Sequence, residues 1–370
     1  MSQKKINYQF KILYAVSMIL VVCSHSSGGG LPFVFAWYPK EAYLVVMFVF
    51  AAGYFYSEKN EKQIFDFLKK QIKKLIIPLY LWNFFYGAFT TILKRFGFGI
   101  GMDLSINTLL WQPIVNGHQF AYNMASWFVV PFFSAQLLYV CIRRMAIQNR
   151  NNTIGECILI LFLLLGGILG LFLSSIGINE GFMLTIDRSL YFLFYYAMGY
   201  FYKKVLEKRD TLPNVYYFGI LLGVVLAIIL YYGYMPGEAP SSMQFYKEGL
   251  IIPFVVALIG IAFWLRVARI LEPVIGRSKI VNEIADNTYS IMVNQFIGFL
   301  IIKTIFGIMW AKCGLFSDFD FDLYKNYIFY TYLPKGLDGF KTIYLIAGIV
   351  VPIYMQKGIN LIKRRLLKNA

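Results

Sequence analysis

The first apolar segment of the chain ends in the stretch Tyr14-Ala-Val-Ser-Met-Ile-Leu-Val-Val-Cys-Ser-His25. An apolar run of this kind predicts a helix that crosses a lipid bilayer. It closes on one of the chain's 2 histidines, the other being His118. Because an imidazole exchanges protons near neutral pH, a histidine at the end of a membrane helix indicates a proton-transfer site. The alternative is a polar anchor that water solvates at the membrane surface.

The composition of the chain is that of a membrane protein. Of its 370 residues, 59% are hydrophobic, 19% are aromatic and only 15% are charged. Soluble domains are usually about half apolar and about a quarter charged. Long apolar segments recur from one end of the sequence to the other, so we expect an all-α, polytopic membrane helical bundle. We expect residues 1–370 to form a single domain with no appended soluble domain.

The apolar segments predict about ten transmembrane helices. Several of them need a few flanking residues to reach the length of about 20 that crosses a bilayer. Their approximate bounds are Gln9–Ser26, Glu41–Tyr56, Ile76–Ile92, Ala125–Cys141, Ile154–Ile176, Leu184–Tyr202, Val215–Tyr234, Leu250–Leu265, Thr288–Met309 and Phe340–Met355.

Basic residues cluster in alternate loops between these spans. They are Lys4, Lys5 and Lys11; Lys59, Lys62, Lys69, Lys70, Lys73 and Lys74; Arg143, Arg144 and Arg150; Lys203, Lys204, Lys208 and Arg209; Arg266, Arg269, Arg277 and Lys279; and Lys357, Lys363, Arg364, Arg365 and Lys368. The positive-inside rule places these loops in the cytoplasm. We therefore expect both termini to be cytoplasmic in a multi-pass protein of a bacterial plasma membrane. Anionic lipid then accounts for the net charge of +16, and no nucleic-acid partner is predicted.

The cysteines do not indicate a metal site or a disulfide framework. Cys23, Cys141, Cys157 and Cys313 form no CxxC pair and have no metal-ligand spacing. We therefore expect no metal cofactor. The first apolar run is not followed by a small-x-small cleavage site, so we interpret it as a retained span rather than a signal peptide.

Helical spacing places Lys11, Tyr14, Met18, Val21 and His25 on one face of the first span. Eleven residues separate Tyr14 from His25, which is about three turns or roughly 16 Å. A cation at one end and an imidazole at the other would frame a passage through most of the membrane. The alternative is a stripe that faces the protein core, with a snorkelling lysine at its base.

A second group of charges lies in Phe67-Leu-Lys69-Lys70-Gln-Ile-Lys73-Lys74-Leu-Ile-Ile-Pro78. At α-helical spacing, Lys69 faces Lys73 and Lys70 faces Lys74, and like charges at this spacing repel. A polyanion bound there would relieve the repulsion, and phosphates are the first candidate. The alternative is a positive-inside flank that touches lipid headgroups.

Several short motifs occur in a fixed order along the chain. They are Leu20-Val-Val-Cys-Ser-His25, Val46-Met-Phe-Val-Phe-Ala-Ala-Gly53-Tyr-Phe-Tyr56, the basic run closing in Leu75-Ile-Ile-Pro78, Ser126-Trp127-Phe128, Arg188-Ser-Leu-Tyr-Phe-Leu-Phe with Gly199-Tyr-Phe-Tyr-Lys203, and Asn287-Thr-Tyr-Ser-Ile-Met-Val-Asn294. Each motif is weak alone. Together, in this order, they resemble the acyltransferase-3 family of integral membrane acyltransferases across most of the chain.

The resemblance implies an enzyme that O-acylates cell-surface glycans, commonly with acetyl groups. Acetyl-CoA or another acyl-CoA would be the donor on the cytoplasmic side, and its phosphates would bind near Lys69, Lys70, Lys73 and Lys74. The acceptor would be a hydroxyl of a cell-surface glycan or lipid-linked sugar on the other side. His25 would act as the general base on that hydroxyl, or carry the acyl group itself.

The chain departs from the family pattern at three positions. Tyr14 stands where the family usually has Arg or Lys, and Lys11, about one turn earlier, is a possible substitute. Ala52 replaces a serine, and Asn294 is followed by Gln295 where many relatives have a histidine. His25 is left as the one clear proton-transfer residue, with Lys11 and Tyr14 as expected substrate contacts.

We expect three further residues to contact substrate. Arg188 would polarise a carbonyl or hold an acidic glycan, unless it only forms a surface pair with Asp187. Trp127 and Asn294 would line the same cavity, with packing as the alternative for Trp127. His118 is either a solvated loop histidine or a catalytic partner. We expect the loops Thr91–Met124 and Trp310–Gly339 to cover the outer mouth of the bundle.

A membrane protein without catalysis is the other class of function. A polysaccharide or lipid-linked sugar transporter would more often show an internal repeat, with broken spans at matching positions of its halves. We find no such pair in this sequence. The sequence does not predict the oligomeric state, the acceptor sugar or the acyl group.

Overall fold

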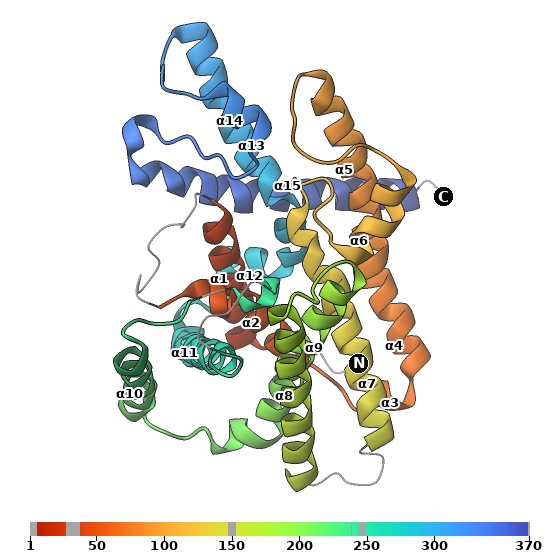
Figure 1. Ribbon diagram of the computed structural model, residues 1–370, viewed down its shortest axis with the longest axis vertical. Coiled ribbons are helices and arrows are strands. Elements are labelled where there is room, and N and C mark those ends of the chain that lie inside the picture. The colour runs from red at the N-terminus through yellow and green to blue at the C-terminus, as the bar shows by residue number, and fades with distance from the viewer. Residues whose placement is uncertain (1–5, 27–37, 147–152, 238, 244–248, 369–370) are drawn as a thin grey trace.

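The computed structural model describes residues 6–26, 38–146, 153–237, 239–243 and 249–368 (Figure 1). The basic residues Lys4, Lys5 and Arg150 lie outside these ranges. Within them, the α-helices are α1 (Tyr8–His25), α2 (Leu44–Tyr54), α3 (Lys59–Lys62), α4 (Ile64–Gln71), α5 (Ile77–Arg95), α6 (Gln112–Val115), α7 (Val129–Ala146), α8 (Thr153–Ser175), α9 (Phe182–Phe201), α10 (Asn214–Tyr232), α11 (Ile252–Ile275), α12 (Lys279–Asp286), α13 (Thr288–Cys313), α14 (Phe321–Asn326) and α15 (Lys341–Lys368).

Short 3-10 and π-helical turns connect several of these helices. They are η1 (Lys40–Ala42), η2 (Ile72–Ile76), η3 (Asn107–Trp111), η4 (Met124–Phe128), η5 (Tyr202–Leu206), η6 (Glu207–Arg209), η7 (Pro240–Ser242), η8 (Pro334–Gly336) and η9 (Asp338–Phe340). The described ranges contain no strand, which agrees with the predicted all-α class.

Eight helical segments of the described chain are long and apolar enough to cross a membrane. They are Tyr8–His25, Ile64–Arg95, Met124–Met145, Thr153–Ser175, Asn214–Tyr232, Ile252–Ile275, Thr288–Cys313 and Asp338–Leu366. The protein is therefore a polytopic membrane helical bundle. The other two predicted spans, Glu41–Tyr56 and Leu184–Tyr202, are helical as α2 and α9 but are not among the eight. The predicted number of about ten is thus not confirmed.

Helix α9 lies inside the protein, against α2, α7 and α8. Most of its side chains are buried, including Asp187 and Arg188. Two glycines bring α9 and α2 into backbone contact, because a Cβ at Gly53 would meet the carbonyl of Tyr196 and a Cβ at Gly199 would meet that of Phe50. Small residues allow this close approach between helices. A helix enclosed by protein needs no lipid-like surface, which explains its aromatic and partly polar sequence.

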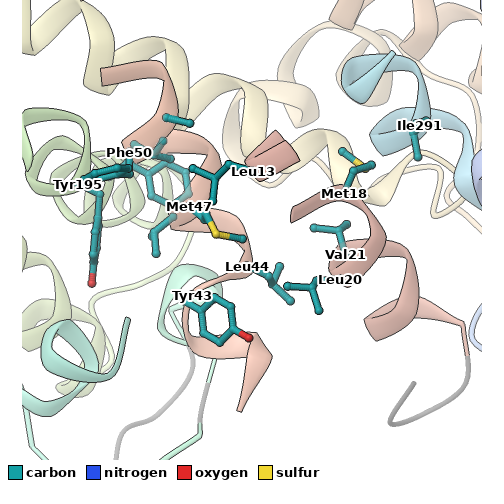
Figure 2. Close-up of a cluster of buried hydrophobic side chains, with 14 of the residues drawn as sticks. Leu13, Met18, Leu20, Val21, Tyr43, Leu44, Met47, Phe50, Tyr195 and Ile291 are labelled. Atoms are coloured by element: carbon teal, nitrogen blue, oxygen red, sulfur yellow. The ribbon is translucent and has the colours of Figure 1, made fainter. Parts of the chain in front are cut away.

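The part of the hydrophobic core drawn in Figure 2 lies between α1, α2, α9 and α13. Leu13 of α1, Met47 of α2, Tyr195 of α9 and Ile291 of α13 are each fully buried in it. Because these helices come from distant parts of the sequence, the core fixes α1 relative to α13. This placement matters for the site, since α1 carries His25.

A buried arginine joins several helix ends that the charge pattern assigns to one side of the membrane. Arg143 of α7 contacts Glu156 of α8 and Glu61 of α3, each at 2.8 Å. Lys204, just after α9, contacts Glu58 at 2.9 Å and Glu156 at 3.0 Å. The ends of α2, α7 and α9 and the start of α8 therefore meet at one end of the bundle.

The loop that follows α5 meets the segment that follows α13, at the ends of these two helices. The backbone N–H of Gly99 donates to the carbonyl of Lys325 at 3.1 Å, and the rings of Phe98 and Tyr324 lie 5.1 Å apart. In the loop after α14, the ring of Phe329 lies 6.3 Å from that of His25. This loop therefore covers the end of α1 that carries the histidine.

Candidate active site

A cavity of about 700 Å³ runs along α1. All the residues of the predicted stripe line it: Lys11, Tyr14, Met18, Val21 and His25. The opposite walls come from α2, the end of η4 with α7, the turn η2, and the junction of α12 and α13. We call this space the central cavity. Its charged residues are Lys11, Lys74 and Asp286 near the start of α1, and the imidazole of His25 lies at the end of that helix.

The ring of His25 has three neighbouring side chains, those of Gln295, Phe296 and Phe329. Its Nδ1 lies 3.0 Å from Oε1 of Gln295 on α13. The ring of Phe296 lies 5.3 Å away and that of Phe329 lies 6.3 Å away, centroid to centroid. Gln295 is fully buried, and its amide nitrogen donates to the carbonyl of Met292 at 3.0 Å. Helix α13 and the loop after α14 thus orient the imidazole.

An ion pair lies at the other end of the central cavity. The ammonium of Lys11 contacts the carboxylate of Asp286, and both residues line the cavity. The side chain of Asp286 is 62% exposed, so this end of the cavity reaches the protein surface. Tyr14 lines the cavity one turn further in, with its ring 6.0 Å from that of Phe48.

The four lysines of the basic run line one hollow of about 450 Å³ together with Asp66. We call it the basic hollow, formed by Asp66, Lys69, Lys70, Lys73 and Lys74. Lys70 and Lys74 interact as like charges, as expected. The turn that contains Lys73 and Lys74 is not a regular α-helix, however, because it is π-helical over Ile72–Ile76. A π-helical turn holds one more residue than an α-helical turn and is frequent at functional sites.

Lys74 lines both spaces, the basic hollow and the central cavity. The adjacent Leu75 is tied to α13, since the hydroxyl of Tyr289 donates to its carbonyl at 3.3 Å. Lys74 therefore lies where the surface cluster of lysines meets the passage that leads along α1 to His25.

Arg188 and Trp127 lie against each other. The guanidinium carbon of Arg188 lies 4.2 Å from the ring centroid of Trp127, and Trp127 lines the central cavity. The guanidinium also donates to the carbonyl of Ser242 at 3.4 Å. The alternative of a surface pair with Asp187 is wrong, because Asp187 and Arg188 are 0% and 3% exposed. In the described structure neither carboxylate oxygen of Asp187 has a hydrogen-bond partner.

Asn294 has a different place from the one we expected. It is fully buried and does not line the central cavity. Its side-chain oxygen accepts a hydrogen bond from the hydroxyl of Tyr86 at 2.7 Å, and its amide nitrogen donates to Ser290 at 3.3 Å. Asn294 thus joins α5 to α13, next to the glutamine that contacts His25.

His118 is mostly enclosed rather than solvated. Burial, with the nearby charge of Arg188, lowers the pKa of His118 to about 4. At neutral pH this imidazole is therefore uncharged. It lies in the loop before Trp127, and Gly117 beside it packs so closely on Trp127 that a Cβ there would lie 2.5 Å from the Trp127 Cα.

The described residues contain no group of three or more His, Cys, Asp or Glu side chains placed to hold a metal ion. All the cysteines are free. The central cavity has two ammonium groups and one carboxylate, those of Lys11, Lys74 and Asp286, and the imidazole of His25.

A protein-family model described as an acyltransferase domain matches residues 7–311. The chain belongs to the acyltransferase-3 family. The matched region of this membrane acyltransferase includes α1, the basic hollow and Gln295. No curated protein and no solved structure matches the chain.

In this acyltransferase, the position eleven residues before His25 is Tyr14, where the resemblance leads us to expect a cation. The structure places Tyr14 on the wall of the central cavity and Lys11 one turn nearer its charged end. Because Lys11 is paired with Asp286, its charge is partly neutralised. The second cation near this end of the cavity is Lys74 of η2.

Proposed function

We propose that this protein moves an acyl group, most simply acetyl, from cytoplasmic acyl-CoA to a sugar hydroxyl on the opposite side of the membrane. The acceptor is a cell-surface glycan, an exopolysaccharide or a lipid-linked sugar. The observation that carries the proposal is the central cavity, which is lined by Lys74 of the basic hollow and by His25.

The donor binds through its phosphates at the basic hollow. Phosphate groups are attracted to clustered ammonium groups, and four lysines surround this space. The pantetheine arm then enters the central cavity past Lys74 and lies beside Tyr14. Between Lys11 and His25 the helix rises about 21 Å, so a long and narrow donor is required to bring a thioester to the histidine.

The chemical step takes place at His25. In one route, the imidazole removes the proton of the acceptor hydroxyl while the hydroxyl oxygen attacks the thioester carbonyl carbon. The new C–O bond forms, the C–S bond breaks, and the thiolate of CoA takes up a proton as it leaves. In the other route, the imidazole nitrogen attacks the thioester carbonyl carbon, the C–S bond breaks and CoA leaves as a thiolate. The acceptor oxygen then attacks the acyl carbon, the C–N bond breaks to release the imidazole, and the hydroxyl proton is taken up by the thiolate. A positioned base typically contributes about 10²–10⁴ in rate.

The proposed topology follows from the charge pattern. Helices α2 and α9 are counted as crossings within the bundle, which brings the number of spans to ten and leaves both termini in the cytoplasm. The helix ends joined by Arg143 then lie at the cytoplasmic face, as does the basic hollow. The protein would reside in the plasma membrane of a bacterium.

The proposal is tested with purified protein in sealed proteoliposomes that contain a sugar acceptor inside and receive radiolabelled acetyl-CoA outside. We expect label on the enclosed acceptor and release of free CoA, with both lost in His25→Ala. The same variant should still bind acetyl-CoA, because the basic hollow is unchanged. Near-normal acylation by His25→Ala contradicts the role of the histidine, and sugar movement without CoA release indicates a transporter instead.

A further inference from the structure

The side-chain amide of Gln295 has only one orientation that satisfies both of its contacts. Its nitrogen donates to the carbonyl of Met292 at 3.0 Å, and a carbonyl oxygen only accepts. The amide oxygen therefore faces the Nδ1 atom of His25, also at 3.0 Å. An amide oxygen cannot donate, so Nδ1 of the imidazole must carry a hydrogen for this bond to form.

The second ring nitrogen of His25 is left available. A neutral imidazole with a hydrogen on Nδ1 has a lone pair on Nε2. Among the described residues, no hydrogen bond engages Nε2. His25 lines the central cavity whereas Gln295 does not, so the Nδ1 side of the ring is against the protein wall. The rings of Phe296 and Phe329 lie beside the imidazole, at 5.3 and 6.3 Å between centroids.

From this geometry we infer that Gln295 is a positioning residue for catalysis, which selects the Nδ1–H tautomer of His25 and presents Nε2 to the acceptor hydroxyl. The inference rests on the proposed function and adds to it the identity of the reacting nitrogen. Partners that hold the far nitrogen of a catalytic or metal-binding histidine commonly fix its tautomer and orientation.

The choice of glutamine rather than a carboxylate also has a consequence. A carboxylate at this position would stabilise the protonated imidazolium, whereas a neutral amide oxygen does so much less. A general base must be unprotonated before it acts. Gln295 therefore orients the ring without favouring the charged form that cannot accept a proton.

The tautomer can be read directly because the chain contains 2 histidines. Protein carrying His118→Gln, labelled with ¹⁵N-histidine and purified without a polyhistidine tag, shows only the ring nitrogens of His25. At neutral pH we expect Nδ1 to have the chemical shift of a protonated nitrogen and Nε2 that of an unprotonated one. Adding Gln295→Met should remove this preference and give a mixture or the opposite tautomer. The opposite tautomer in the presence of Gln295 would overturn the inference.

Kinetics give the second readout. Gln295→Met should lower kcat by about 10- to 100-fold with an unchanged KM for acyl-CoA, as outer partners of reacting groups do. Gln295→Glu should keep the orientation but move the acid limb of the kcat–pH profile to higher pH by about one unit or more, because the carboxylate stabilises imidazolium. A purely structural role for Gln295 would not move the pH profile.

A matched control is Gln9→Met, which removes another buried glutamine that donates to a backbone carbonyl, that of Leu265 at 3.0 Å. Gln9 does not line the central cavity, so kcat and the pH profile should stay as in the wild type. If His25→Ala is inactive while Gln295→Met keeps full kcat, only the inference about Gln295 fails. If His25→Ala is active, the proposed catalytic role of the histidine fails as well.

Discussion

Lys74 and His25 line one cavity, and Lys74 lies toward the Lys11 end of it. Its neighbour Leu75 accepts a hydrogen bond from Tyr289 at the start of α13, and Asp286, just before α13, pairs with Lys11. No compact anion bound at Lys74 can reach His25, because the stripe on α1 is about four turns long. A ligand that uses both residues must therefore be elongated and have its negative charge at one end. Acyl-CoA fits this description, since its phosphates lie at one end and its thioester at the other.

Lys74→Gln should raise the KM for acyl-CoA by about tenfold, because a hydrogen bond between charged groups is worth roughly 1.5–3 kcal/mol. The measurement is acyl transfer at varied donor concentration. Lys62→Gln is the matched control, since Lys62 is an exposed lysine near the same helix that does not line the basic hollow. An equal rise in KM for both variants would mean that only general surface charge matters.

Asp286→Asn should lower the KM for acyl-CoA by about two- to fivefold. The carboxylate now neutralises Lys11 at the charged end of the cavity and repels phosphates, and its loss leaves a free ammonium there. Pairs this exposed are worth about 0.2–1 kcal/mol, which sets the size of the effect. The change should shrink in high salt, and a KM that rises instead would show that Asp286 contacts the donor favourably.

Gly199→Ala should destabilise the protein by about 1–3 kcal/mol or more, because the new Cβ meets the backbone of Phe50 and pushes α9 away from α2. A thermal stability assay in detergent would measure the loss. Gly223→Ala on the exposed helix α10 is the control, since nothing lies within 4 Å of a Cβ there. A helical alanine is otherwise more favourable than glycine, so the control should be neutral or stabilising.

Arg143→Met should cost about 3–5 kcal/mol of stability, the usual result of leaving a buried charge without its partner. Arg143 is 0% exposed and Glu156 is 1% exposed, so the carboxylate would keep only Lys204 as a counter-ion. Arg144→Met next to it changes an exposed arginine and should stay within about 0.5 kcal/mol. Comparable losses in the two variants would contradict a special role for the buried arginine.

His118 should make stability depend on pH below neutrality. Its pKa of about 4 in the folded protein is below the ordinary value of 6.5, chiefly because of burial and then because of Arg188. Above pH 6.5 both states are neutral, and between 6.5 and 4 the unfolded chain gains a proton that the folded chain does not, so stability falls. Thermal midpoints measured from pH 7 to 4 should fall less in His118→Gln, and identical slopes would contradict this.

The features that depend on local periodicity could be predicted from the sequence. Helical spacing alone predicts that the five residues of the α1 stripe share one face of the helix. The structure places all five on the wall of the central cavity. Eight of the expected spans have the length and polarity of membrane helices. Helix α9 does not have the hydropathy of a membrane helix, because its neighbours are other helices of the protein rather than lipid. Hydropathy detects only helices whose surface is apolar enough to face lipid.

The features that depend on tertiary contact could not be predicted. Gln295 is 270 positions from His25, and nothing local to either residue indicates their pairing. Lys11 and Asp286, which also pair, are 275 positions apart. Sequence adjacency offers a surface pair of Arg188 with Asp187 as the alternative to a substrate contact, but it does not indicate that Arg188 packs against Trp127. The sequence signal for Gln295 was its position beside Asn294.

The shared position of Lys74 at the basic hollow and at the central cavity has a consequence for turnover. In the proposed function, free CoA leaves the central cavity past Lys74, by the route through which acyl-CoA enters. A new acyl-CoA therefore cannot bind until free CoA has dissociated. Free CoA and acyl-CoA are then mutually exclusive occupants, so product inhibition should be competitive with the donor. The rate of modification would follow the ratio of the two in the cytoplasm rather than the donor level alone.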